Sequence, residues 1–163
     1  RVDHEIMGQD LTLVDFVALI DNFVQMRSQT YISHKLEFDK PKLPVMLRIN
    51  ESRLVQVLDN ILSNAISFSP KQGVVVFSLH HKAKDRIVVL EIIDNGPGIP
   101  ETKLETVFNR FYSERPSDEE FGKHSGLGLS IARQIVRAHY GELTAHNFPK
   151  GGTCFRLVLP LES

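Results

Sequence analysis

The chain has 163 residues, of which 42% are hydrophobic and 24% are charged, and its formal net charge is −1 at pH 7. This composition is typical of one globular domain with a full hydrophobic core, and the balanced charge gives no indication of a nucleic-acid partner. No apolar run reaches the roughly 18 residues of a membrane span. Cys154 is the only cysteine, so an intrachain disulfide is excluded and Cys154 is interpreted as a core residue. Because the chain begins at Arg1 rather than Met, we expect it to be part of a longer protein.

The N-terminal third contains one predicted helix and two extended segments. Apolar residues recur at helical spacing over about Leu13–Gln29, after a possible N-cap at Asp10. Short extended segments are predicted at 35–39 and 45–49, separated by two prolines.

The next helix, predicted from Glu51 to about Ser67, carries two different stripes at about 100° per residue. The apolar stripe, which is predicted to face the core, comprises Leu54, Leu58, Ile61, Leu62 and Ala65. The polar stripe comprises Arg53, Gln56, Asn60, Ser63, Asn64 and Ser67. The polar stripe is mostly uncharged, which is unusual for a helix face that meets only solvent.

A β-hairpin is predicted from the apolar segments 74–79 and 87–93, and its second strand runs directly into Asp94-Asn95-Gly96-Pro97-Gly98-Ile99-Pro100. Side chains alternate along a strand, so Leu90, Ile92 and Asp94 share one face. A carboxylate in line with core aliphatic residues is costly to bury unless a donor meets it. Two donors remain open at this point: backbone N–H groups of the turn itself, as in an Asx turn, or an amino group of a ligand.

The C-terminal part combines a long polar segment with a glycine-rich helix start. Helical turns are predicted at 101–107, and residues 109–125 are polar and without periodicity, which is typical of a functional lid or a disordered segment. Ser125-Gly126-Leu127-Gly128-Leu129-Ser130 opens a helix that is predicted to run to about Tyr140 and to stop at Gly141. The last two predicted strands are about 142–146 and 153–160.

Two of these features suit nucleotide chemistry, although each is weak evidence when taken alone. A Gly-x-Gly at a helix start, here Gly126 and Gly128, lets an anion approach free N–H groups at the positive end of the helix dipole. Asn60 and Asn64 face the same way at i and i+4, and an amide oxygen is a suitable ligand for Mg²⁺. An asparagine pair on a helix is more often solvated or engaged in capping.

Taken together and in this order, the motifs resemble the boxes of sensor histidine kinases. The segments that carry the resemblance are Gln56–Pro70 (N box), Asp94–Ile99 (G1 box), Phe108-Asn109-Arg110-Phe111-Tyr112 (F box), Ser125–Leu129 (G2 box) and the closing turn Gly151-Gly152-Thr153-Cys154-Phe155. The resemblance covers roughly residues 10–161. It implies an α+β fold, a two-layer α/β sandwich with about three helices on one face of a mixed, mainly antiparallel five-stranded sheet, and a long mobile ATP lid.

The resemblance also implies cofactors and site residues. The cofactors are ATP and Mg²⁺, with Asn64 as the metal ligand, Asp94 as acceptor for the adenine amino group, and Asn60 and Arg115 as candidate catalytic residues. The implied nucleotide-binding residues are Asn60, Asn64, Phe68, Asp94, Gly96, Gly98, Ile99, Phe108, Arg110, Tyr112, Lys123, His124, Ser125, Gly126, Leu127, Gly128, Leu129 and Thr153.

The sequence departs from the family pattern at three positions. Ser67 and Ser113 stand where many relatives carry a basic residue, and Phe68 lacks the hydroxyl of the usual aromatic. The phosphate charge must then be met by some of the basic side chains of the lid, and the choice stays open. These candidates are Arg110, Arg115, Lys123 and His124.

By resemblance, residues 1–10 are the tail of a dimerisation segment and residues 11–163 are the catalytic ATP-binding domain. The implied function is transfer of the γ-phosphoryl group of ATP to a histidine on that dimerisation domain, followed by signalling to a response regulator. The intact protein is expected to be a homodimeric kinase anchored in a bacterial inner membrane, with this domain in the cytoplasm and not itself in contact with the membrane. His4 lacks the rest of an acceptor motif, so the isolated chain is not expected to phosphorylate itself.

Two rival functions remain. Related ATPases of the gyrase, heat-shock-chaperone and mismatch-repair group use a glutamate four residues before the metal-binding asparagine to activate water. Asn60 occupies that position here, and an amide cannot act as a general base. Phosphoryl transfer is therefore favoured over hydrolysis. The other rival is a non-catalytic module that binds nucleotide or only a partner.

Overall fold

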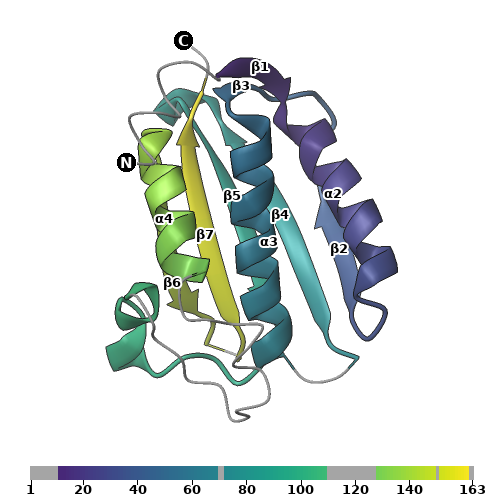
Figure 1. The fold of residues 1–163 in the computed structure, drawn as a ribbon, viewed down its shortest axis with the longest axis vertical. Helices are drawn as coiled ribbons and strands as arrows, with labels where there is room; N and C mark the ends of the chain where they lie inside the picture. Colours follow the sequence, from purple (N-terminus) through teal and green to yellow (C-terminus); the bar gives the residue numbers. More distant parts are fainter. Residues whose placement is uncertain (1–10, 70–71, 110–127, 150, 162–163) are drawn as a thin grey trace.

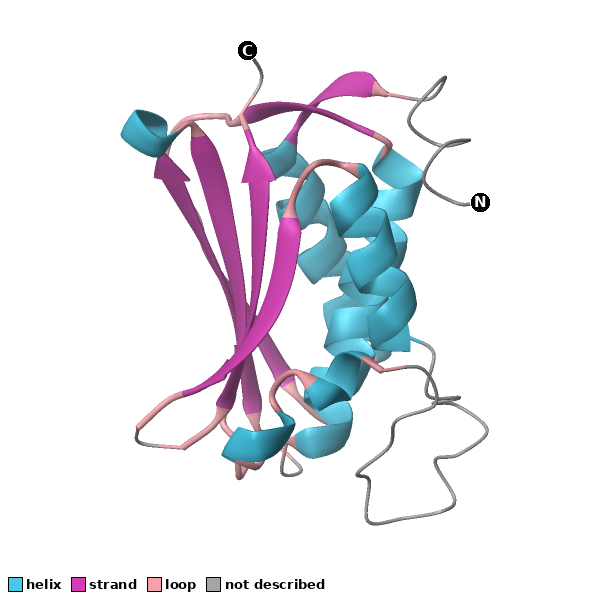
Figure 2. Cartoon of the chain, turned by 90° about the vertical axis from the view of Figure 1, so that its left-hand side faces the viewer, coloured by secondary structure: helices cyan, strands magenta, loops and turns pink. Residues whose placement is uncertain are grey.

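The computed structural model describes residues 11–69, 72–109, 128–149 and 151–161. Five strands form the main sheet in the order β2-β4-β5-β7-β6, and all neighbours are antiparallel except β2 and β4. The strands are β2 (Lys35–Asp39), β4 (Val74–Lys82), β5 (Ile87–Asp94), β6 (Glu142–Asn147) and β7 (Thr153–Pro160). Helices α2 (Phe16–Thr30), α3 (Glu51–Phe68) and α4 (Gly128–Ala138) cover one face of this sheet, and no α-helix of the described residues lies on the other face (Figures 1 and 2). The predicted α+β sandwich is confirmed.

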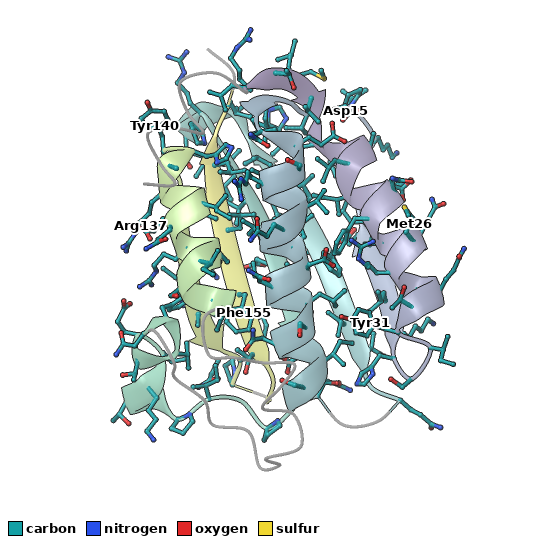
Figure 3. The ribbon with its side chains drawn as sticks, viewed as in Figure 1. Asp15, Met26, Tyr31, Arg137, Tyr140 and Phe155 are labelled. Atoms are coloured by element: carbon teal, nitrogen blue, oxygen red, sulfur yellow. The ribbon has the colours of Figure 1, made fainter. Side chains whose placement is uncertain are left out.

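The core lies between the helices and the covered face of the sheet. The five residues of the predicted apolar stripe of α3 are all 0% exposed, and Phe77, Ile92 and Phe155 meet them from the strands with the same exposure. Figure 3 shows Phe155 in the layer beneath α3 and α4. Each such side chain stabilises the fold by about 1.5–3 kcal/mol when it is removed from water. None of the helices in the described ranges is long and apolar enough to cross a membrane.

The start of the first predicted helix was wrong. Residues Thr12–Asp15 form strand β1, which pairs antiparallel with β3 (Met46–Ile49) in a separate two-stranded sheet. Helix α2 begins only at Phe16, and its N-cap is Asp15, whose Oδ1 accepts hydrogen bonds from Val17 and Ala18. The proposed cap Asp10 lies outside the described residues. The apolar spacing at the start of this predicted helix fits the period of a strand as well as that of a helix. The long-range pairing with β3 decides in favour of the strand.

The hairpin prediction was correct and its strands are longer than expected. Strands β4 and β5 pair over Val75–Lys82 and are joined through the 3₁₀ turn η1 (Ala83–Asp85). Leu90, Ile92 and Asp94 are all buried on the helix-covered side, as the alternation predicted. Asp94 is the last residue of β5 and therefore lies at the end of the sheet where α4 begins (Figure 1).

The end of α4 is built differently from the sequence expectation. Tyr140, not Gly141, takes the left-handed backbone conformation that ends the helix, with φ of 64°. Gly141 is needed for a different reason, because a Cβ there would lie 2.2 Å from the carbonyl oxygen of Val158.

His139 directly follows the last residue of α4 and links this helix to the start of α3. Its side chain is buried, with 3% exposed. Its Nε2 accepts from the N–H of Asn50, so its Nδ1 donates to the carbonyl of Ile135. Burial lowers the pKa of His139, which favours this neutral form.

Candidate functional site

Asp94 is a buried carboxylate whose two oxygens have different surroundings. The side chain is 2% exposed, and Oδ1 accepts hydrogen bonds from the backbone N–H groups of Gly96 at 2.8 Å and Thr153 at 3.3 Å. Oδ2 is also buried, but it has no hydrogen-bond partner among the described residues. Burial raises the pKa of Asp94, and the two backbone donors act in the opposite direction. The backbone donor that the sequence left open is therefore found at Oδ1, and Oδ2 has no donor among the described residues.

Strand β7 begins directly beside Asp94 and adds a second unpartnered polar atom. Thr153 is 1% exposed, and its Oγ1 is buried without a partner among the described residues. The preceding residue, Gly152, has φ of +96°, and a Cβ there would lie 2.3 Å from the carbonyl oxygen of Asp94. Only glycine allows the two strands to meet so closely at this point. The close approach is what brings the Thr153 backbone N–H to the carboxylate.

The loop after Asp94 is fixed by a residue from β6. Asn147 Oδ1 accepts from the N–H of Ile99 at 2.9 Å, and Asn147 Nδ2 donates to the carbonyl of the same residue. This amide pair holds Ile99 through both of its backbone polar groups. The neighbouring Gly98 has φ of +90°, and a Cβ there would lie 3.0 Å from Asn147 Oδ1. Asn147 therefore determines where the glycine-rich turn lies.

Helix α3 and the start of α4 meet at the asparagine pair. Asn60 Nδ2 donates to the carbonyl of Gly128 at 3.0 Å, and Asn64 Nδ2 donates to the carbonyl of Asn60 at 2.9 Å. A Cβ on Gly128 would lie 3.7 Å from the Asn60 side chain and 3.9 Å from Asn64 Nδ2. The positive end of the α4 dipole is thus held beside two amide side chains. This arrangement suits a phosphate and a hard cation.

A buried arginine on α4 holds the segment that precedes residue 110. This segment consists of two 3₁₀ turns, η2 (Glu101–Lys103) and η3 (Thr106–Phe108). The Arg133 guanidinium pairs with both carboxylate oxygens of Glu105 and lies 3.8 Å from the centre of the Phe108 ring. Phe108 also meets Phe155 edge-on at 6.4 Å between ring centres.

The predicted site residues within the described part of the chain fall into three groups, apart from Gly98, which lies against Asn147 in the turn after Asp94. Asp94, Gly96 and Thr153 are in direct hydrogen-bond contact, and Asn60, Asn64 and Gly128 form a second cluster. Ile99, Phe108 and Leu129 are buried in the apolar core. Eight predicted residues lie outside the described part of the chain: Arg110, Tyr112, Arg115, Lys123, His124, Ser125, Gly126 and Leu127. The side chain of Phe68 is also outside it.

Two residues of this region, Arg133 and Asn147, were missed by the sequence analysis. Each is a polar residue in line with buried apolar residues of its own helix or strand. Arg133 lies on the buried stripe of an amphipathic helix, together with Leu129, Ala132 and Val136. A charged residue on such a stripe needs a partner, which is a reason to look for one. Asn147 is a polar residue at the end of a strand, and nothing in the sequence indicates that it reaches Ile99.

Cys154 lies on β7, next to Thr153 in the chain. It is 0% exposed, and burial raises its pKa to about 12. This burial supports its interpretation as a core residue.

Comparison with known proteins identifies the family. A model described as "Histidine kinase-, DNA gyrase B-, and HSP90-like ATPase" matches residues 49–163. The chain belongs to this family. The Sensor protein ChvG of Rhizobium meliloti (strain 1021) is 40% identical over 98% of this chain and 30% of its own length. The sensor histidine kinase WalK of Bacillus subtilis (strain 168) is 32% identical over 97% of this chain and 26% of its own length. The chain therefore spans about a third or less of these relatives.

Solved structures agree with the assignment to this ATPase family. The mycobacterial sensor histidine kinase MprB has a TM-score of 0.78 and 29% sequence identity, and the match covers 93% of this chain and 98% of that one. The catalytic domain of the histidine kinase ThkA has a TM-score of 0.80 at 23% identity, covering 94% of this chain and 97% of that one, and so shares the fold. The resemblance to sensor histidine kinases is confirmed.

The close approach at Gly152 can be tested against its neighbour. Gly151 also has a positive φ, of +102°, but the nearest atom to a Cβ there is 3.9 Å away. We predict that Gly151→Ala lowers the free energy of unfolding by about 1–3 kcal/mol through backbone strain. Gly152→Ala should cost about 1–3 kcal/mol more, because its methyl group also collides with Asp94. Urea unfolding of both variants measures the difference, and equal losses would contradict the close contact between residue 152 and the end of β5.

Proposed function

We propose that this domain binds ATP through the buried carboxylate of Asp94. The observation that carries the proposal is the unpartnered Asp94 Oδ2, because a buried carboxylate oxygen without a donor is unfavourable and the exocyclic amino group of adenine is such a donor. The unpartnered Oγ1 of Thr153 lies on the adjacent strand and can contact the same edge of the base. Membership of an ATPase family supports this choice of ligand.

The phosphates and Mg²⁺ belong at the other cluster, where α3 meets the start of α4. The amide oxygen of Asn64 is the proposed metal ligand, and the Asn64–Asn60 hydrogen bond fixes the plane of that amide. Among the described residues, no three His, Cys, Asp or Glu side chains are grouped to hold a metal. The donor set therefore fits Mg²⁺ that is carried largely by nucleotide phosphates and water, as this ion usually is in kinases. When bound, the ion would neutralise phosphate charge.

The reaction that we propose is phosphoryl transfer to a protein histidine rather than hydrolysis. Asn60 occupies the position of the general base in related hydrolases, and its Nδ2 is engaged with the carbonyl of Gly128. An amide held in this way orients the helix start but cannot take a proton from water. The chain's own residues thus bind and align ATP, and the acceptor histidine would come from the dimerisation domain.

We infer that the intact protein is a homodimeric, membrane-anchored sensor kinase that signals to a response regulator. Its relatives ChvG and WalK are sensor proteins, and the structural neighbour ThkA has been solved in complex with the response regulator protein TrrA. Residues 1–10 would then be the end of the dimerisation segment, and residues 11–163 the catalytic domain. The choice of basic residue for the γ-phosphate stays open among the four lid candidates Arg110, Arg115, Lys123 and His124.

Replacing Asp94 tests the adenine contact. Asp94→Asn removes the charge from the acceptor, and a charge-assisted hydrogen bond is worth about 1.5–3 kcal/mol. Affinity for Mg-ATP, measured by calorimetry, should fall roughly 10- to 150-fold. The matched control is Asp85→Asn, an exposed residue at the opposite end of the same hairpin, which should bind like the parent chain. A folded Asp94→Asn variant with unchanged affinity would remove Asp94 from the nucleotide site.

Phosphoryl transfer is tested with γ-labelled ATP. We predict that the chain does not label itself but labels a separately supplied dimerisation segment that carries the acceptor histidine. The label should be acid-labile and stable to alkali, as expected of phosphohistidine. Steady release of inorganic phosphate without transfer would favour the hydrolase function. Label on the isolated chain that disappears in His4→Ala would place the acceptor at His4 instead.

A further inference from the structure

Arg133 makes an unusually dense set of contacts for a charged residue. It lies on α4 and is 9% exposed, among core side chains. Besides the fork on Glu105 and the stacking on Phe108, its Nε and Nη2 donate to the carbonyl of Leu143 in β6 at 3.2 and 3.1 Å. The hydrogen bond and charge of Arg133 lower the pKa of Glu105, so this carboxylate is held ionised. One side chain therefore connects a helix, a strand and the η3 turn.

The segment that Arg133 holds has little regular structure of its own. Between the end of β5 at Asp94 and residue 108, the backbone forms only the 3₁₀ turns η2 and η3, whose hydrogen bonds are weaker than those of an α-helix. Asn147 anchors the start of this segment at Ile99, and Arg133 anchors its end. These two side chains from outside the segment hold it at two places, in addition to the burial of Ile99, Val107 and Phe108 in the core.

We propose that Arg133 is a positioning residue that fixes the 95–108 segment to α4 and thereby keeps the adenine pocket in register with the phosphate end of the site. The same helix begins at Gly128, which is hydrogen-bonded to Asn60, and carries Arg133 within its first two turns. In this proposal Arg133 acts through the 95–108 segment, by its contacts with Glu105, Phe108 and Leu143, and not by contact with the nucleotide. Its role in nucleotide affinity rests on the function proposed above, whereas its role in holding the segment does not.

The chemistry requires arginine rather than any cation. The planar guanidinium offers two parallel donors to Glu105 and a flat face to the Phe108 ring at the same time. A lysine ammonium can pair with the carboxylate but cannot stack in this way. Arg133→Lys should therefore rescue only part of what a neutral substitution loses.

The test compares Arg133→Met with Arg137→Met. Arg137 lies one turn further along α4, its side chain is 54% exposed, and Glu142 is its ion-pair partner. Figure 3 shows Arg137 on the outer side of α4, away from the sheet. Amide hydrogen exchange over residues 95–108 is measured without nucleotide, and the Kd for Mg-ATP is measured by calorimetry. Arg133→Met should speed exchange and weaken ATP binding, each on the order of tenfold, and Arg137→Met should do neither.

A second variant keeps the test decisive if Arg133→Met does not fold. Glu105→Gln changes a side chain that is 78% exposed, so it removes the charge partner without opening the core. It should speed exchange in the same segment by about two- to fivefold. Unchanged exchange in the folded variants would overturn the anchoring role. Faster exchange in Arg133→Met with unchanged ATP affinity would overturn the link to the nucleotide. If the parent chain binds no ATP, the proposed function fails, while hydrogen exchange still decides whether Arg133 holds the segment.

Discussion

A carboxylate buried at the end of a strand constrains this end of the molecule. Asp94 is 2% exposed, and the described residues provide hydrogen-bond donors to only one of its oxygens. Oδ1 accepts from the N–H of Gly96, in an Asx turn, and from the N–H of Thr153. The second hydrogen bond brings the start of β7 so close to the end of β5 that a side chain at residue 152 has no room. Gly152 is thus a consequence of holding this carboxylate in place. The second oxygen has no such partner among the described residues, which is what a site for a hydrogen-bond donor needs.

The site joins this carboxylate to a second cluster that is built on helices. Asn60 and Asn64 lie on α3, and the hydrogen bond from Asn60 holds the first residue of α4 beside them. Because α3 also packs over β5, the same helix relates the two clusters to each other. Asn147 and Arg133 then fix the loop that leaves Asp94. A nucleotide with its base at one cluster and its phosphates at the other would span rigid elements that are tied together by few, specific side chains.

Local patterns in the sequence predicted the elements that depend on local information. The alternation of Leu90, Ile92 and Asp94 placed the carboxylate on the core side, and the apolar stripe of α3 predicted its fully buried face. The order of the motifs identified the family. Strand β1 was missed because its residues also fit a helical period and its partner lies more than thirty residues away. The roles of Asn147 and Arg133 depend on which loop passes over them, and this is decided only when the chain folds.

The proposed role of Asp94 Oδ2 is to accept a hydrogen bond from the amino group of adenine. The most direct measurement compares the affinities of ATP and purine riboside triphosphate, which lacks only that amino group, for the parent chain and for Asp94→Asn. We predict that the parent chain prefers ATP by at least about tenfold, since a hydrogen bond to a charged group is worth about 1.5–3 kcal/mol. Most of this preference should vanish in Asp94→Asn. Equal affinities of the parent chain for the two nucleotides would contradict this role.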